Sequence, residues 1–181
     1  MRQIILLAFI IIGSSFYINE SQDIPKRSLK KIDKELLKLW EGVTIQKNKI
    51  NSINKSANVS IKGHEQVYKL SNEANELLAY MMLSKAPGRY DDFDLMIVYD
   101  AENLNILSTS VLIYREEYGG EIGSKRWLKQ FVGKNFLNTF KLDYEIQGIS
   151  GATISVRSAT KEIKRLSLLM KELQDNQLLI P

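Results

Sequence analysis

The chain of 181 residues contains no cysteine and a single histidine. Without cysteine it has no disulfide framework and no thiolate metal or redox site. His64, beside Gly63 in an expected turn, is too little for a histidine-rich metal site or for a Ser-His-Asp triad. Asp91, Asp92 and Asp94 lack the glycine and the distal glutamate of a calcium loop. We therefore predict no metal site.

The chain also has no large excess of charge of one sign. The formal net charge is +4, with 25 Lys and Arg residues dispersed among 21 Asp and Glu residues, a pattern that argues against a nucleic-acid partner. The basic residues between Lys26 and Lys38 alternate with Leu29, Ile32 and Leu36 at helical spacing. We interpret them as the solvated face of a helix, with contact to anionic lipid headgroups as the alternative.

No apolar run is long enough for a comfortable membrane span, which needs about twenty residues. The most apolar run, residues 4–12, follows Met1-Arg2-Gln3 and precedes Gly13-Ser14-Ser15, the pattern of a bacterial export signal. We expect residues 1–20 to be a cleaved signal peptide or, as the alternative, an N-terminal membrane anchor. The protein would then be periplasmic or held at the outer face of the cytoplasmic membrane.

About 160 residues remain after the leader, enough for one compact domain. We predict an α+β fold in which a curved, mainly antiparallel sheet is flanked by helices. Residues 21–62 would hold a helix over 26–40 and a polar connector, and residues 63–181 would form the main domain. Turns are expected at 72–75, 86–89 and 100–103. Strands are expected at 43–46, 66–70, 77–84, 93–99 and 106–114.

Small residues and hydroxyls cluster immediately before a periodic helix. Residues 148–155 read Gly-Ile-Ser-Gly-Ala-Thr-Ile-Ser. The first amide groups of a helix have no partner within it, and its dipole favours an anion there, so the cluster predicts a phosphate site. The alternative is a glycine turn with Thr153 or Ser155 as the helix N-cap. The apolar stripe of the helix consists of Val156, Ala159, Ile163, Leu166, Met170 and Leu173.

A second segment combines glycine with aromatic residues. Residues 117–123 read Glu-Tyr-Gly-Gly-Glu-Ile-Gly, and Trp127, Phe131, Gly133 and Lys134 follow. Three glycines within five positions allow backbone amides to approach a flat ring, which Trp127 or Tyr118 would cover. The alternative is a glycine-rich turn before a helix whose Trp127 and Phe131 pack in the core.

Together these segments resemble the FMN-binding domain family, over roughly residues 65–170. Ser150-Gly151-Ala152-Thr153 resembles the flavinylation signature of that family, approximately Asp-x-x-(Ser/Thr)-Gly-Ala-Thr, and residues 117–123 resemble its Glu-Thr-Pro-Gly-Leu-Gly loop. The family includes the G subunit of Rnf electron-transport complexes and the C subunit of sodium-translocating NADH:quinone reductase. One departure is Gln147, which stands where the signature has aspartate.

The resemblance implies FMN as the cofactor. A flavin transferase would join the FMN phosphate to the hydroxyl of Thr153 through a phosphoester. Because Gln147 lacks the charge of aspartate, noncovalent FMN and an unmodified protein remain alternatives. Positive charge from Arg115, Lys125 and Arg126 would offset the negative charge of the phosphate or of reduced flavin. The cofactor-binding residues implied are Thr153, Ala152, Gly151, Ser150, Gly120 and Glu117.

The function implied is that of an exported FMN-binding protein that carries electrons and exchanges them with a redox partner protein in or at the membrane. The protein would then be an electron carrier rather than an enzyme with its own turnover, and it would supply no catalytic residue. One alternative is a flavin-free extracytoplasmic binding or scaffold module that retains the fold, for which Gln147 is the best argument. Another is a flavin-dependent reductase with a small substrate of its own.

Overall fold

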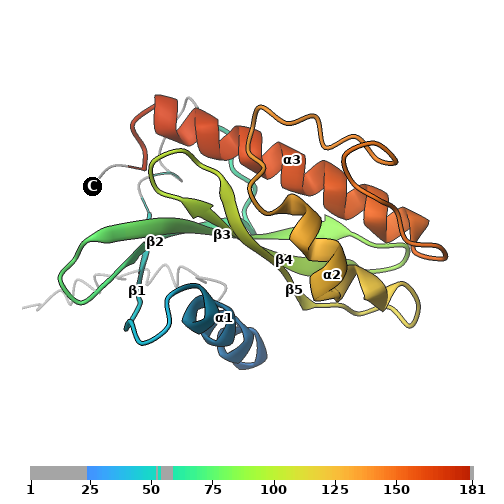
Figure 1. The fold of residues 1–181 in the computed structure, drawn as a ribbon, viewed down its shortest axis with the longest axis horizontal. Helices are drawn as coiled ribbons and strands as arrows, with labels where there is room; N and C mark the ends of the chain where they lie inside the picture. Colours follow the sequence, from blue (N-terminus) through green and yellow to red (C-terminus); the bar gives the residue numbers. More distant parts are fainter. Residues whose placement is uncertain (1–23, 52, 54–58, 180–181) are drawn as a thin grey trace, which may run out of the picture.

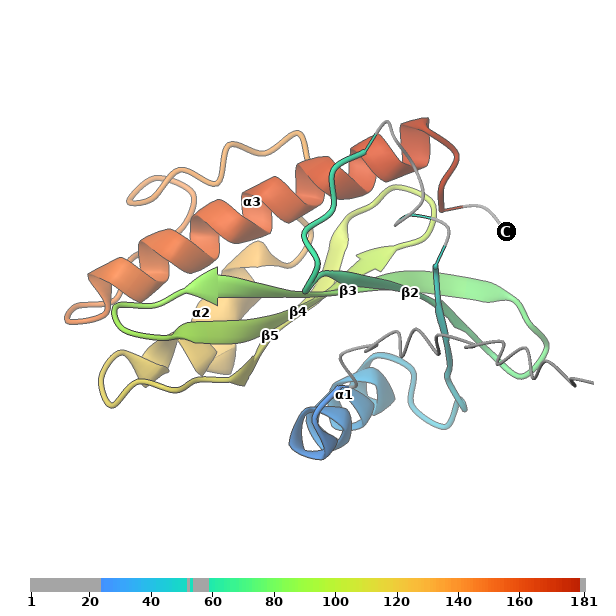
Figure 2. The same cartoon turned by 180° about the vertical axis from the view of Figure 1, so that it is seen from behind.

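The computed structural model describes residues 24–51, 53 and 59–179 (Figures 1 and 2). The predicted export signal lies outside the described residues. Within them, no helix has the length and apolar character that crossing a membrane requires. The elements are α1 (Lys26–Leu39), β1 (Gln46–Lys49), β2 (Gln66–Ser71), β3 (Leu77–Pro87), β4 (Asp92–Asp100), β5 (Ile106–Ile113), η2 (Gly120–Gly123), α2 (Lys125–Leu128), η3 (Lys129–Phe131) and α3 (Thr153–Asp175).

The five strands form one antiparallel sheet in the order β1-β2-β3-β4-β5, so that each strand pairs with its neighbour in the chain. This arrangement confirms the predicted α+β fold. The strand expected at 43–46 instead lies at Gln46–Lys49, inside the segment expected to be a connector. Its four residues are polar, and their side chains are exposed or partly exposed. The strand is therefore held by backbone pairing with β2, which leaves no apolar pattern in the sequence.

The sheet separates two apolar clusters. Figures 1 and 2 show α3 lying across one face of the sheet and α1 against the other. On strand β4, Ile97 packs in the cluster below α3, whereas Met96 and Val98 pack in the cluster below α1. Successive side chains of a strand point to opposite faces. A strand covered on both faces therefore reads as a continuous apolar run, as this one does.

Helix α3 is 23 residues long, and its apolar stripe is the predicted one. All six residues of that stripe are at most 2% exposed, which confirms the helix and the face it buries. A partly buried ionic cluster also ties α3 to the segment before β2. Arg165 pairs with Glu65 and, at 2.6 Å, with Glu162, which accepts a hydrogen bond from Ser84 at 3.0 Å.

Candidate functional site

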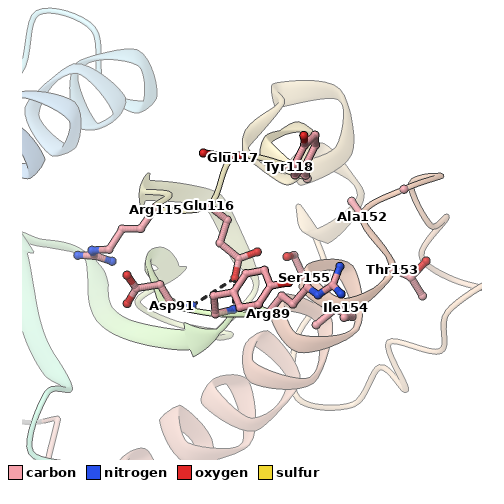
Figure 3. Close-up of a pocket in the computed structure, with 13 residues that line it drawn as sticks. Arg89, Asp91, Arg115, Glu116, Glu117, Tyr118, Ala152, Thr153, Ile154 and Ser155 are labelled. Atoms are coloured by element: carbon pink, nitrogen blue, oxygen red, sulfur yellow. Dashed lines mark hydrogen bonds between the residues drawn. The ribbon is translucent and has the colours of Figure 1, made fainter.

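The two segments that the sequence singled out meet at a cavity of about 630 Å³ (Figure 3). Residues 115–119, which follow β5, form one wall, and residues 151–155, at the start of α3, form another. A third wall comes from residues 89–91, in the turn between β3 and β4. This turn lies next to the segment after β5 because β4 pairs with both β3 and β5.

The start of α3 has no side-chain cap. Ala152 is the N-cap residue and Thr153 the first residue of the helix, so the predicted capping by Thr153 or Ser155 is wrong. The hydroxyl of Ser155 instead lies 2.9 Å from that of Tyr114. The amide groups of the first turn are thus left for a ligand or for water, and the helix dipole favours an anion at this point.

Thr153 lies at the boundary between two hollows. It lines the cavity and also a smaller depression of about 300 Å³, to which Asp143, Ser150 and Arg157 contribute. Its side chain is exposed, and Figure 3 shows it directed away from Glu116. A hydroxyl placed in this way is accessible to a modifying enzyme. Of the predicted cofactor residues, Ser150 lines the depression, whereas Gly151 and Ala152 line the cavity.

Gly119 allows the loop after β5 to approach the start of α3. Its φ is +85°, and a Cβ atom at this position would lie 2.7 Å from the Tyr114 hydroxyl and 3.4 Å from the Cβ of Ala152. Tyr114 donates its hydroxyl hydrogen to the carbonyl of Tyr118 at 2.8 Å. Because a phenol has only one hydrogen, Ser155 is the donor in the other contact. Tyr114 therefore joins the loop to the helix.

The predicted residues of the glycine loop separate into two groups. Glu117 and Tyr118 line the cavity, and the side chain of Tyr118 is 81% exposed. Gly120 begins η2 and is not part of the cavity lining. Trp127 is 4% exposed, and its indole N–H donates to the carbonyl of Gln147 at 2.9 Å. The core interpretation is thus confirmed for Trp127, and Tyr118 is the aromatic residue at the cavity.

Residues 88–166 match the sequence model of the FMN-binding domain. The chain therefore contains an FMN-binding domain over these residues. No curated protein sequence matches the chain. The matched region contains all three walls of the cavity, including the turn at 89–91. It begins at Gly88 and ends within α3, inside the range over which the sequence resembles the family.

FMN is the cofactor of this domain, and the cavity fits it in size and chemistry. Small-molecule pockets commonly enclose roughly 300–1,000 Å³, and the cavity is within this range. The uncapped start of α3 suits the phosphate of FMN, and the backbone at Gly119 and the ring of Tyr118 suit a flat ring system. The residues that would hold FMN are therefore those of the cavity walls.

The cations of the FMN-binding domain are not placed as the sequence suggested. Arg115 lines the cavity, but its guanidinium pairs with Asp94 at 2.9 Å and donates to the carbonyl of Asp92 at 2.6 Å. The hydrogen bond with Asp94 raises the pKa of Arg115. Lys125 and Arg126 are not part of the cavity lining. They lie in α2, outside the cavity walls, and their role in offsetting the flavin charge stays a prediction.

Arg89 is the cation that the sequence reasoning missed. It lies in the exposed turn expected at 86–89, and its guanidinium carbon is 5.1 Å from the centre of the Tyr90 ring. The turn is fixed by Glu116, whose carboxylate accepts the backbone N–H of Tyr90 at 2.7 Å and that of Asp91 at 3.3 Å. These hydrogen bonds lower the pKa of Glu116. The turn lines the cavity because β3 and β4 pair beside the segment after β5. The local sequence of the turn does not reveal this position.

Gln147 has a structural role through its backbone. Its carbonyl accepts from Trp127, and its N–H donates to the side-chain oxygen of Gln130 at 2.7 Å. Asp143, four residues earlier, has its carboxylate close to Gly148, because a Cβ atom at Gly148 would lie 3.7 Å from Asp143 Oδ1. The depression beside Thr153 therefore contains a carboxylate although position 147 lacks one.

Proposed function

We propose that this FMN-binding protein is an electron carrier whose flavin is attached through a phosphoester to Thr153. The observation that supports it most directly is the position of Thr153. The motif Ser150-Gly151-Ala152-Thr153 places an exposed hydroxyl on the first residue of an uncapped helix, at the boundary of the cavity. Attachment there would leave the phosphate beside the amide groups of the first turn, which favour an anion.

FMN supplies the redox chemistry, since it accepts and releases one or two electrons. The protein binds and orients it. The amide groups at the start of α3 would hold the phosphate, Gly119 would let the ring approach the backbone of the loop, and Tyr118 would cover part of the ring. An open rim would leave one edge of the ring accessible to a partner, as electron exchange between proteins requires.

The carboxylate that the attachment signature requires is proposed to come from Asp143. The signature has an aspartate where this chain has Gln147, but Asp143 lines the same depression as Ser150 and Thr153. A flavin transferase approaching Thr153 from this side would meet that carboxylate. The function of the missing aspartate would thus be retained by a residue from a neighbouring position.

Export and a redox partner complete the proposal. Residues 1–20 have the pattern of a bacterial export signal. Flavin transfer and electron exchange would then take place in the periplasm or at the outer face of the cytoplasmic membrane. The partner would be a redox protein in or at that membrane.

Intact mass tests the attachment. The chain, with residues 1–20 intact, is coexpressed with a flavin transferase, and the purified protein is weighed by mass spectrometry. The native chain and Thr153→Ser should gain the mass of FMN less one water, and Thr153→Ala should not. Ser150→Ala is the matched control, because it removes the neighbouring hydroxyl of the motif. Equal gain in Thr153→Ala and the native chain would refute attachment at Thr153.

A flavin-free module is the second candidate, and Gln147 is the observation that favours it. In that case the coexpressed protein would have its unmodified mass and no visible absorbance. Reversion of Gln147 to aspartate would then test whether the lost charge explains the lost cofactor.

A further inference from the structure

Of the two arginines that line the cavity, only Arg89 forms no ion pair with an Asp or Glu of the described residues. Arg115 is held by Asp94 in an ion pair. The guanidinium of Arg89 lies over the ring of Tyr90. The charge of Arg89 helps to lower the pKa of Glu116, but the carboxylate of Glu116 is itself engaged by the backbone N–H groups of the turn. A guanidinium that lines a binding cavity without an ion pair is available for an anionic ligand.

Arg89 lies on the side of the cavity where α3 begins. Both Arg89 and residues 151–155 belong to the cavity lining. Figure 3 shows the side chain of Arg89 extending toward Ile154, in the first turn of the helix. The cavity therefore presents two favourable environments for an anion from different parts of the chain, the guanidinium of the β3–β4 turn and the amide groups of α3.

The turn that carries Arg89 is fixed in place. Glu116 accepts two backbone N–H groups of the turn, and Gly88 donates its own N–H to the carbonyl of Asp91 at 2.9 Å. A Cβ atom at Gly88 would lie 2.4 Å from both the Asp91 carbonyl oxygen and the Glu116 carboxylate. The absence of a side chain at position 88 thus allows the turn to fold onto Glu116. The base of the Arg89 side chain is held accordingly.

We propose that Arg89 recognises the phosphate of FMN, together with the amide groups of the first turn of α3. The inference rests on the proposed position of the phosphate at that helix start. A guanidinium binds phosphate through two parallel hydrogen bonds, so it adds both charge and orientation. The contact serves free FMN before attachment and the phosphodiester after it. Arg89 consequently makes the cavity selective for FMN over riboflavin, which has the same ring and no phosphate.

The test compares the two flavins. The full chain is produced without a flavin transferase, so that no covalent bond forms, and FMN and riboflavin are titrated by flavin fluorescence. We expect Arg89→Ala to weaken FMN binding about ten- to a hundred-fold, the range for hydrogen bonds to a charged group, and riboflavin binding less than about threefold. Arg89→Lys keeps the charge and loses the paired hydrogen bonds of the guanidinium, so its FMN affinity should lie between those of the native chain and Arg89→Ala.

The matched control is Arg126→Ala. Arg126 is an exposed arginine that does not line the cavity, and its removal changes the net charge by the same amount. Its affinities for both flavins should equal those of the native chain. Thermal unfolding of each variant, measured without flavin, shows whether a loss of affinity reflects a loss of folded protein.

Four outcomes would overturn the proposal. If Arg89→Ala weakens both flavins equally, Arg89 acts on the ring or on the fold. If it weakens neither, or if Arg126→Ala has the same effect on FMN, the contact is absent or unspecific. If the native chain binds neither flavin, phosphate recognition by Arg89 fails. The intact-mass experiment then still decides on attachment at Thr153, since the transferase supplies the flavin there.

Discussion

The contact between Gly119 and the hydroxyl of Tyr114 gives a quantitative test of how the cavity is built. In Gly119→Ala, the new residue must adopt a φ of +85°, which costs an L-residue about 1–2 kcal/mol. Its Cβ would also lie 2.7 Å from the Tyr114 hydroxyl. That hydroxyl must move, and its hydrogen bonds to Tyr118 and Ser155 weaken, at about 0.5–1.5 kcal/mol each. We expect a total loss of about 2–5 kcal/mol of unfolding free energy.

Tyr114→Phe separates the two contributions. Alone, it should cost about 1–3 kcal/mol, because it removes both hydrogen bonds. In the double variant the hydroxyl that would clash with the new Cβ atom is absent. Its two hydrogen bonds are already lost in Tyr114→Phe, so they are not lost a second time. The cost of adding Gly119→Ala should then fall to the conformational part, about 1–2 kcal/mol.

Urea denaturation of the single and double variants measures these costs. FMN titration of the same variants measures whether the cavity keeps its affinity for the flavin. Gly133→Ala is the control. Gly133 has a φ of +80° with nothing within 4 Å of a Cβ atom, so its cost should be the same in either background. Additive costs for Gly119→Ala and Tyr114→Phe would refute the reasoning, because they would show that the hydroxyl is not what excludes a side chain.

Two further predictions concern the ionic cluster and the attachment site. Burial raises the pKa of Glu162, but hydrogen bonds and charge from Arg165 outweigh it and hold the pKa below its ordinary value of 4.5. Its contribution to stability should therefore be complete above that value and be lost as pH falls through the lower folded pKa. In urea denaturation against pH, Glu162→Gln should cost about 2 kcal/mol at neutral pH and less in acid; a pH-independent cost would contradict this. In flavinylation followed by intact mass, Asp143→Asn should slow the gain of FMN and Gln147→Asp should speed it, whereas unchanged rates would exclude a role for either carboxylate.

The sequence predicted those elements whose packing produces a periodic pattern. The stripe from Val156 to Leu173 predicted α3, because one helix face covers the sheet. The apolar runs of β3, β4 and β5 were predicted because both faces of these strands are buried. Strand β1 was placed too early, since its pairing uses backbone groups and its side chains lie at or near the surface.

At the site, local motifs predicted two walls and missed the third. Residues 117–123 and 148–155 have compositions that suit a flavin, and the structure brings them together at Gly119 and Ala152. Arg89 has no such signal, because its position depends on hairpin geometry and on Glu116, 27 residues later in the chain. Tyr114 was likewise not distinguishable from any other tyrosine at the end of a strand.

The order of the strands separates the short-range contacts of the fold from the long-range ones. Each pairing in the sheet joins strands that are adjacent in the chain, and such short-range contacts form quickly. Helix α3 must instead return across the sheet to contact β3, where Ser84 and Glu162 are 78 residues apart in the chain, and its first turn then completes the cavity. Completion of the cavity therefore depends on a long-range contact of the fold. A ligand that bridges its walls stabilises the closed state by mass action and so secures the helix on the sheet.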